Sequence, residues 1–312
     1  MTRVLVHDRF RPFLEGVLPQ GVEVLWYESG DEFAEQAHEA EVIWPDFSLK
    51  GVTGQALETA HAMRWCSVMS SGVDWLPVAL LRERGVVLTN GAGLHAHSVA
   101  EFTVLGMLSH AKQWGAILAA QTRREWLSEP PGKGELLDAQ VLVIGAGEIG
   151  QRIRTLLEAF DAQVTMARRT AGEGELGGDQ WRAELGRFDW VILIVPSTAQ
   201  THHMMGAAEF AAMKPGAVLV NVARGDVVDQ DALVAAIDSG HLGGAYLDVT
   251  DPEPLPADHP LWACPNVTIS MHTSGLAQNS LYRRAAARFL DNLHHYLAGE
   301  PLVHEVDFSR GY

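Results

Sequence analysis

The feature that most restricts the possible folds of this chain is a strand, a glycine-rich turn and a helix in direct succession. Four apolar residues, 141–144, lead into the spacing GxGxxG, and the helical segment 151–160 follows at once. In this setting the first glycine permits a tight turn, the second lets the backbone approach a pyrophosphate, and the third lets helix and strand pack closely. The motif therefore predicts a dinucleotide site, with a plain glycine turn as the alternative. The residues assigned to it are Gly145, Gly147, Glu148, Ile149 and Gly150.

Short apolar runs alternate with polar, helix-capable segments along the chain, which is the pattern of βα units. The runs are residues 4–6, 22–26, 42–44, 65–69 and 86–88, then 141–144, 164–167, 190–195, 218–221 and 245–249. The runs from residue 141 onward are almost wholly apolar, as expected for parallel strands covered on both faces. We therefore predict an α/β fold with two doubly wound parallel-sheet domains, a Rossmann dinucleotide-binding domain and a smaller flavodoxin-like substrate domain.

Two further helical patterns suggest how these domains are joined. Residues 98–121 carry apolar side chains at helical spacing, so we predict one connecting helix with Ser98 as its N-cap. Residues 281–297 predict a final helix, and because so short a tail could not fold alone, we expect it to pack back on the first domain. The predicted domains are residues 1–97 with 279–312 (substrate) and residues 98–278 (dinucleotide).

Composition narrows the range of partners. The chain has 39 acidic and 23 basic residues and a formal net charge of -16, which disfavours nucleic acid and anionic membrane surfaces as partners. We expect a soluble, cytoplasmic protein, because the N-terminus runs straight into a strand, only Cys66 and Cys264 are present, and no apolar stretch approaches the roughly 18 residues that span a bilayer. An anionic substrate would need a local arginine, since the overall charge repels it.

Two arginines stand where a dinucleotide site selects its cofactor. An NAD site usually has an acidic residue at the end of the second strand, but Arg168 and Arg169 follow the strand 164–167 here. Guanidinium groups would hold a 2′-phosphate in charge-assisted hydrogen bonds. The pattern favours NADP(H), with NAD(H) possible. The alternative is a pair of solvated surface arginines beside the acidic Glu173 and Glu175.

Three later segments each place polar residues after an apolar strand, at the edge where parallel sheets bind ligands. Residues 221–229 read NVARGDVVD, residues 247–255 read LDVTDPEPL, and residues 270–275 read SMHTSG. Together with SSGVD at 70–74 and Asn90, their order resembles the D-2-hydroxyacid dehydrogenase family over nearly the whole chain. The resemblance implies an NAD(P)-dependent oxidoreductase that reduces a small 2-oxo acid to the D-2-hydroxy acid by hydride transfer.

The resemblance also implies roles for three side chains. Arg224 would hold the substrate carboxylate and the reacting oxygen, and His272 would be the general acid in reduction and the base in oxidation. Glu253 would hydrogen-bond the imidazole, orient it and favour its protonated form. Taken singly, each has a structural alternative: an ion-paired arginine, an ordinary loop histidine, and a solvated glutamate in a turn.

Other contacts follow from the same resemblance. Asp248 would contact the nicotinamide carboxamide, and the amides of Ser71 and Gly72 would bind the substrate carboxylate. The remaining cofactor contacts would come from Pro196, Val222, Ala223, His272, Ser274 and Gly275.

The segments 42–45 and 306–312, with the two arginines, resemble the glyoxylate/hydroxypyruvate reductase branch of the family. One position departs from the family: a proline commonly precedes the catalytic histidine, but Met271 stands here, which puts the pose of that histidine in doubt. Trp44 could line the substrate pocket, although a tryptophan that ends a strand is more often core. Related enzymes pair through the nucleotide domain, so we expect a homodimer.

Two other classes of function compete with this interpretation. A dinucleotide-sensing binding protein, like the corepressors that resemble these dehydrogenases, could keep the same residues. A formate-type dehydrogenase is less favoured because that lineage lacks the glutamate partner. We expect no metal site at His202 and His203 or at His294 and His295, because neighbouring side chains on a helix or strand point apart and we read these residues as surface positions.

Overall fold

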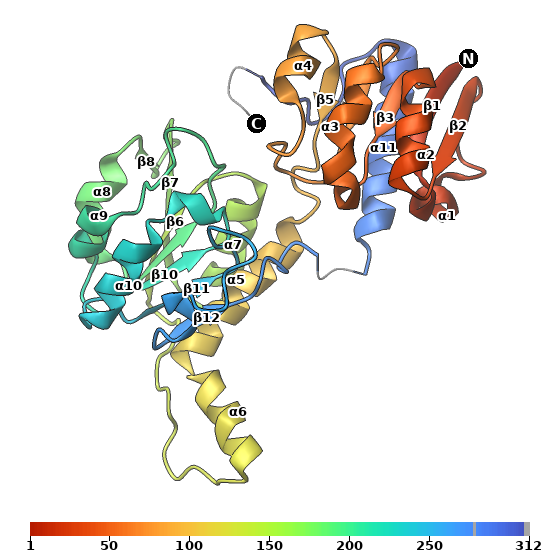
Figure 1. The fold of residues 1–312 in the computed structure, drawn as a ribbon. Coiled ribbons are helices and arrows are strands. Elements are labelled where there is room, and N and C mark those ends of the chain that lie inside the picture. Colours follow the sequence, from red (N-terminus) through yellow and green to blue (C-terminus); the bar gives the residue numbers. More distant parts are fainter. Residues whose placement is uncertain (277–278, 309–312) are drawn as a thin grey trace. The chain divides into compact units, whose positions relative to one another are not determined.

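The computed structural model describes residues 1–276 and 279–308 of the chain (Figure 1). The chain divides into two compact units, unit 1 with Met1–His95 and Gln278–Tyr312, and unit 2 with Ala96–Ala277. The predicted boundary at residue 278 and part of the C-terminal resemblance, residues 309–312, lie outside the described residues. The assignment of substrate to one domain and dinucleotide to the other stays a prediction.

Unit 1 contains a five-stranded sheet in the order β2-β1-β3-β4-β5, and all neighbouring strands are parallel. This is the flavodoxin-like order of a doubly wound sheet, as predicted. Its elements are β1 (Thr2–His7), α1 (Arg11–Leu14), β2 (Val22–Tyr27), α2 (Gly30–Gln36), β3 (Val42–Trp44), α3 (Lys50–Thr59), β4 (Trp65–Ser67), α4 (Val78–Glu83), β5 (Val87–Thr89) and α11 (Leu281–Ala298).

Side chains alternate between the two faces of this sheet because successive strand residues point to opposite sides. Val6 packs in a cluster with α1 and α11, whereas Leu5 packs in a cluster with α2, α3 and α4. Trp44 is 2% exposed and stacks between Phe10 and Phe289, with ring centroids 4.0 and 4.6 Å away. Trp44 is therefore a core residue and does not line a substrate pocket.

Unit 2 contains a seven-stranded parallel sheet in the order β12-β11-β10-β9-β6-β7-β8. The reversal of strand order between β6 and β9 is the Rossmann switch point, where dinucleotides bind outside the carboxyl ends of the strands. Its elements are α5 (Ala96–Ala111), α6 (Trp114–Arg123), β6 (Gln140–Ile144), α7 (Glu148–Glu158), β7 (Gln163–Arg168), β8 (Leu176–Gly177), α8 (Gln180–Glu184), β9 (Trp190–Leu193), α9 (Ala207–Ala212), β10 (Val218–Asn221), α10 (Gln230–Asp238), β11 (Gly244–Leu247) and β12 (Val267–Ile269).

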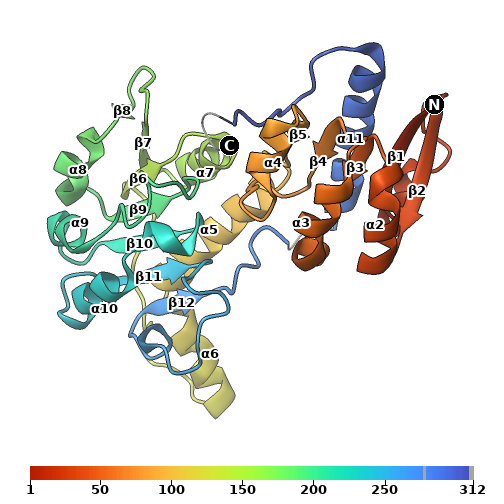
Figure 2. The same ribbon diagram turned by 45° about the horizontal axis from the view of Figure 1, so that its top comes forward.

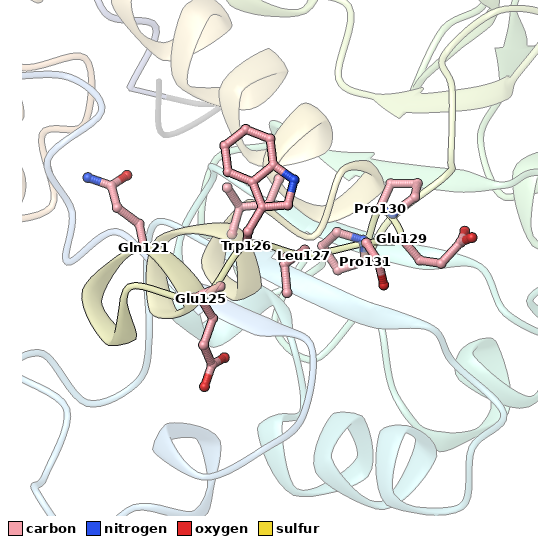
Figure 3. A pocket seen from close by; sticks show the side chains of 10 residues that line it. Gln121, Glu125, Trp126, Leu127, Glu129, Pro130 and Pro131 are labelled. Carbon is pink, nitrogen blue, oxygen red and sulfur yellow. The ribbon is translucent and has the colours of Figure 1, made fainter.

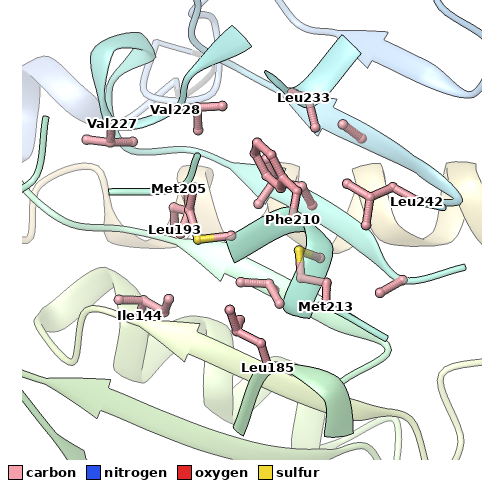
Figure 4. Packing of buried hydrophobic residues seen from close by; sticks show 14 of the residues in the cluster. Ile144, Leu185, Leu193, Met205, Phe210, Met213, Val227, Val228, Leu233 and Leu242 are labelled. Atoms are coloured by element: carbon pink, nitrogen blue, oxygen red, sulfur yellow. The ribbon is translucent and has the colours of Figure 1, made fainter. Parts of the chain in front are cut away.

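Each face of the unit 2 sheet is closed by helices, which explains why its strands are apolar throughout. Val143 belongs to the cluster formed with α5 and α7. Leu142 belongs to the opposite cluster, in which Phe210 of α9 and Leu233 of α10 pack over the sheet (Figure 4). No helix in the described part of the chain is both long and apolar enough to cross a membrane.

The predicted connecting helix is wrong in two respects. The segment forms two helices, α5 and α6, because Gln113 between them has φ 50°, a left-handed conformation that an α-helix cannot contain. Ser98 is not the N-cap, since α5 begins at Ala96 and the buried Ser98 hydroxyl donates to the Ser274 carbonyl at 2.5 Å. The two-residue strand β8 was not predicted either.

Candidate active site

The glycine turn after β6 has the geometry that a dinucleotide requires. Gly145 has φ +119°, and a Cβ there would lie 2.1 Å from the Ile194 carbonyl oxygen. A Cβ on Gly150 would lie 2.0 Å from the Gly145 oxygen, so strand and helix touch at these two positions. A Cβ on Gly147 would meet nothing within 4 Å. Packing thus requires the first and third glycines, whereas the second leaves space over the N-terminus of α7, where backbone N–H groups favour an anion. Gly147 is the N-cap of that helix, and Glu148 and Ile149 begin its first turn.

The two arginines at the end of β7 differ in their partners. Arg168 Nε lies 2.5 Å from Oε2 of Glu175. Arg169 is exposed to solvent. The side chains therefore do not form a uniform cationic pair, because one of them is already bound to a carboxylate.

Arg224 and Glu253 follow neighbouring strands, β10 and β11, whose carboxyl ends share one edge of the sheet. The side-chain amide of Asn221 donates to the Arg224 carbonyl at 2.9 Å and so closes the turn after β10. Gly225 then brings this turn against the next segment, because a Cβ on it would lie 2.0 Å from the carbonyl carbon of Thr250. No larger residue fits there, and the close approach places the Arg224 turn beside the segment that carries Glu253.

His272 and Glu253 form a direct contact, with 2.8 Å between Nδ1 and Oε2. The other carboxylate oxygen accepts the Thr250 N–H at 3.2 Å. Burial alone would raise the pKa of Glu253, but the hydrogen bond and charge of His272, the Thr250 N–H and the charge of Arg224 together hold that pKa below its ordinary value. The carboxylate is therefore kept ionised.

The loop that carries His272 is strained, since Met271 and His272 have φ of 53° and 55°. Asp248, at the end of β11 and 2% exposed, holds this loop in place. Its carbonyl accepts the His272 N–H at 2.5 Å, and its carboxylate accepts several further donors. These are the Ser270 hydroxyl at 2.6 Å, the Thr273 amide at 3.1 Å, and the amide and hydroxyl of Ser274. Sequence reasoning missed this role, and the predicted contact of Asp248 with nicotinamide stays a prediction.

Several backbone groups predicted to line the cofactor already have partners in the protein. The amide of Val222 donates to the Leu193 carbonyl at 3.2 Å, and the amide of Ala223 donates to the Asn221 side chain at 3.0 Å. The Pro196 carbonyl accepts the Thr201 hydroxyl at 2.7 Å. Ser274 is buried and Gly275 is half-buried beside it. Their cofactor contacts remain predictions.

Ser71 and Gly72 lie in unit 1, in a turn after β4. The Asn90 side chain donates to the Ser71 carbonyl at 2.9 Å, and the Ser70 hydroxyl donates to the Gly72 carbonyl at 2.7 Å. Within the described residues, the amide N–H groups of Ser71 and Gly72 donate to no protein acceptor. The turn is thus fastened through its carbonyls, which leaves two N–H groups for an anion.

The expectation that His202 and His203 point apart is wrong. Their rings stack, with centroids 4.1 Å apart, because the pair lies in a turn in which His203 has φ 48°. Both side chains are exposed, as expected. Across residues 1–276 and 279–308, no group of three His, Cys, Asp or Glu side chains could hold a metal ion.

Comparisons with known proteins identify the family. Residues 104–274 match the model of the D-isomer specific 2-hydroxyacid dehydrogenase NAD binding domain. The glyoxylate/hydroxypyruvate reductase B of Citrobacter koseri is 34% identical over 262 residues, which cover 81% of each chain.

Solved structures agree with this match. A D-isomer specific 2-hydroxyacid dehydrogenase family protein from Aeromonas salmonicida has a TM-score of 0.87 and 28% identity, covering 98% of this chain and 99% of that one. An NADPH-dependent glyoxylate/hydroxypyruvate reductase from Sinorhizobium meliloti, in complex with NADP and malonate, has a TM-score of 0.81 and 26% identity, covering 99% and 97%. The predicted fold and family resemblance are confirmed, and the chain belongs to the D-isomer specific 2-hydroxyacid dehydrogenase family.

Proposed function

We propose that this oxidoreductase reduces a small 2-oxo acid of the glyoxylate or hydroxypyruvate type to the D-2-hydroxy acid, with NADPH preferred over NADH. The observation that carries the proposal is the 2.8 Å contact between His272 Nδ1 and Glu253 Oε2, at the edge of the sheet where Arg224 follows the neighbouring strand. An imidazole, a carboxylate and a guanidinium at the edge of a nucleotide-binding sheet are the groups that carbonyl reduction requires.

The residues divide the chemical work between them. When NADPH is bound, its nicotinamide supplies the hydride. Arg224 Nη1 donates to the Ala223 carbonyl at 2.8 Å, and the remaining donors of the guanidinium would hold the substrate carboxylate. The guanidinium also supplies locally the positive charge that a protein of net charge -16 lacks overall. His272 binds Glu253 through Nδ1, which leaves Nε2 to pass a proton to the carbonyl oxygen. Glu253 fixes the ring and stays ionised because its pKa is lowered.

Support for NADPH comes from the loop after β7. Arg169 is exposed, and it follows Arg168 at the position where NAD sites usually place a carboxylate. Among the structural neighbours that are at least 25% identical, the names of two proteins mention this cofactor: the Sinorhizobium reductase, and a dehydrogenase from Xanthobacter autotrophicus in complex with NADPH and MES that is 27% identical. We propose the same preference here.

For unit 1 we propose that the amides of Ser71 and Gly72 bind the substrate carboxylate. The support is their pair of N–H groups without an acceptor in the described protein. Backbone N–H groups in such a turn form a nest that suits a carboxylate. Side-chain substitutions at Ser71 and Gly72 should therefore change substrate affinity less than changes to the backbone conformation of this turn do.

We also propose a homodimer that pairs through α6 and the loop after it. This segment projects from the rest of unit 2 in both views (Figures 1 and 2). Between α6 and the loop lies a hollow of about 530 Å³, bordered by Leu127, Pro130 and Pro131 (Figure 3). Trp126 is 97% exposed, and Trp114 is half exposed at the start of α6. Exposed apolar surface gathered on one projecting segment marks an interaction site, and a second copy of the chain would cover it.

The test of the proposed reaction follows nicotinamide absorbance with NADPH or NADH against glyoxylate, hydroxypyruvate, pyruvate and phenylpyruvate. We expect the highest kcat/KM with NADPH and either glyoxylate or hydroxypyruvate. Oxidation of neither cofactor by any of these acids would refute the proposed reaction. A preference for NADH would refute the proposed cofactor while leaving the reaction intact.

A further inference from the structure

The loop between Arg168 and Gly177 is closed into a defined structure at the edge of the nucleotide-binding sheet. Strand β8 pairs in parallel with β7, so Arg168 lies opposite Gly177. The Gly178 amide donates to the carbonyls of Arg168 and Arg169 at 3.1 Å each. The loop is anchored next to the glycine turn, because the Gly145 amide donates to the Ala167 carbonyl at 2.8 Å. The side chains of this loop are therefore held close to where a dinucleotide would bind.

Inside this loop lies a carboxylate that the proposed function does not use. Glu175 Oε2 lies 2.5 Å from Arg168 Nε and also accepts the Gly172 amide at 2.7 Å. Its side chain is only 10% exposed, whereas that of Arg168 is 44% exposed. A Cβ on Gly172 would lie 2.6 Å from Arg168 Nη2 and 2.8 Å from Glu175 Oε2, so the tips of both side chains lie directly over this glycine. Glu175 is thus a fixed negative charge behind the Arg168 guanidinium.

The geometry of this pair has two opposed effects on a 2′-phosphate. Glu175 bonds Nε and leaves both terminal nitrogens of Arg168 available to an anion, so it does not block the guanidinium. The negative charge of Glu175 nevertheless cancels the positive charge of Arg168 for any group that lies beyond direct contact with the guanidinium. Arg169 would then supply the uncompensated positive charge of the loop, and a phosphate dianion would be repelled by Glu175.

We propose that Glu175 is a specificity-determining residue that limits the preference for NADPH over NADH. This inference rests on the proposed function, in which the arginines after β7 receive the 2′-phosphate. A unit negative charge about 7 Å from a dianion, in a solvent-like dielectric and partly screened by salt, weakens binding about 2- to 7-fold. NADH has no 2′-phosphate, so its binding does not change by this mechanism. The Glu175 carboxylate therefore reduces the difference in affinity between NADPH and NADH, so that NADH can also serve as cofactor.

The experiment measures calorimetric binding of adenosine 2′,5′-bisphosphate and of AMP, which differ only in the 2′-phosphate, to the full-length protein. The variant E175Q keeps an oxygen that can accept from Arg168 and Gly172 but removes the charge. E175S removes both, and it serves as the second variant if the first fails to fold. The matched control is E173Q, which removes an equal charge from an exposed position in the same loop.

We expect E175Q to raise the ratio of bisphosphate to AMP affinity about 2- to 7-fold over wild type, with AMP affinity unchanged. E173Q should raise the ratio less than about twofold, since its charge is solvated. A wild-type preference for the bisphosphate combined with an unchanged or lower ratio in E175Q and E175S would overturn the inference alone. Equal wild-type affinities for the two ligands would instead refute the proposed 2′-phosphate site, and the inference with it.

Discussion

Replacing Met271 by proline, the residue that commonly stands before the catalytic histidine in this family, should disable the active site here, because the loop of this chain has a left-handed conformation at residue 271. Met271 has φ 53°, and its side chain is 69% exposed, so the substitution removes no buried contact. The proline ring locks φ at about -65°, so a proline at position 271 cannot adopt the left-handed conformation that Met271 has. We expect the loop to rearrange and to lose the bonds that Asp248 makes to it, because proline cannot keep the native φ at residue 271. His272 would then leave Glu253, and a displacement of about 1 Å at a catalytic group can cost about 100-fold in rate.

The assay compares kcat/KM of M271P for the best 2-oxo acid with that of wild type and of M271G. Glycine accepts a positive φ without strain, which stabilises the folded loop by about 1 kcal/mol. The greater conformational entropy of glycine in the unfolded chain offsets this gain in stability. The kcat/KM of M271G should therefore stay within about threefold of the wild-type value. Calorimetric binding of AMP checks that the nucleotide site is intact. If M271P keeps wild-type activity while still binding AMP, the left-handed loop is not what positions His272, and this reasoning fails.

Further predictions concern three other parts of the protein. G147A should fold with wild-type thermal stability yet bind NADPH at least about 10-fold more weakly. G150A should lose about 1 to 3 kcal/mol of folding stability, because its methyl group meets the Gly145 carbonyl. Equal stability of the two variants would contradict the packing argument. R224A should lower kcat/KM for the acid substrate at least about 100-fold, and an unchanged value would remove Arg224 from the site. W126E should convert a dimer to a monomer in light scattering, and a wild-type monomer would refute the proposed interface.

The sheet and its functional edge were predictable because both depend on local patterns. Apolar runs identified the core strands, since a parallel strand covered on both faces has no polar alternation to obscure it. The polar segments that carry Arg224, Glu253 and His272 follow such runs, so their position at one edge follows from parallel topology. The contact between His272 and Glu253, 19 residues apart in sequence, required coordinates.

The features that were missed depend on non-local contacts or on single dihedral angles. Apolar spacing continues across Gln113, so periodicity could not reveal the left-handed residue that separates α5 from α6. Ser98 has the chemistry of an N-cap, but tertiary packing gives its hydroxyl a carbonyl acceptor. Strand β8 has two residues and no apolar run, and it exists because the loop containing Arg168 and Glu175 closes against β7.

His272 and Glu253 act as one unit in the proposed reaction, and a double-mutant cycle on kcat tests this directly. H272Q should lower kcat at least about 100-fold, and E253Q should lower it less, because the glutamate acts through the imidazole. The double variant should then be no slower than H272Q alone, within about threefold. If the losses multiply fully in the double variant, or if H272Q turns over at the wild-type rate, the proposed acid-base pair is wrong.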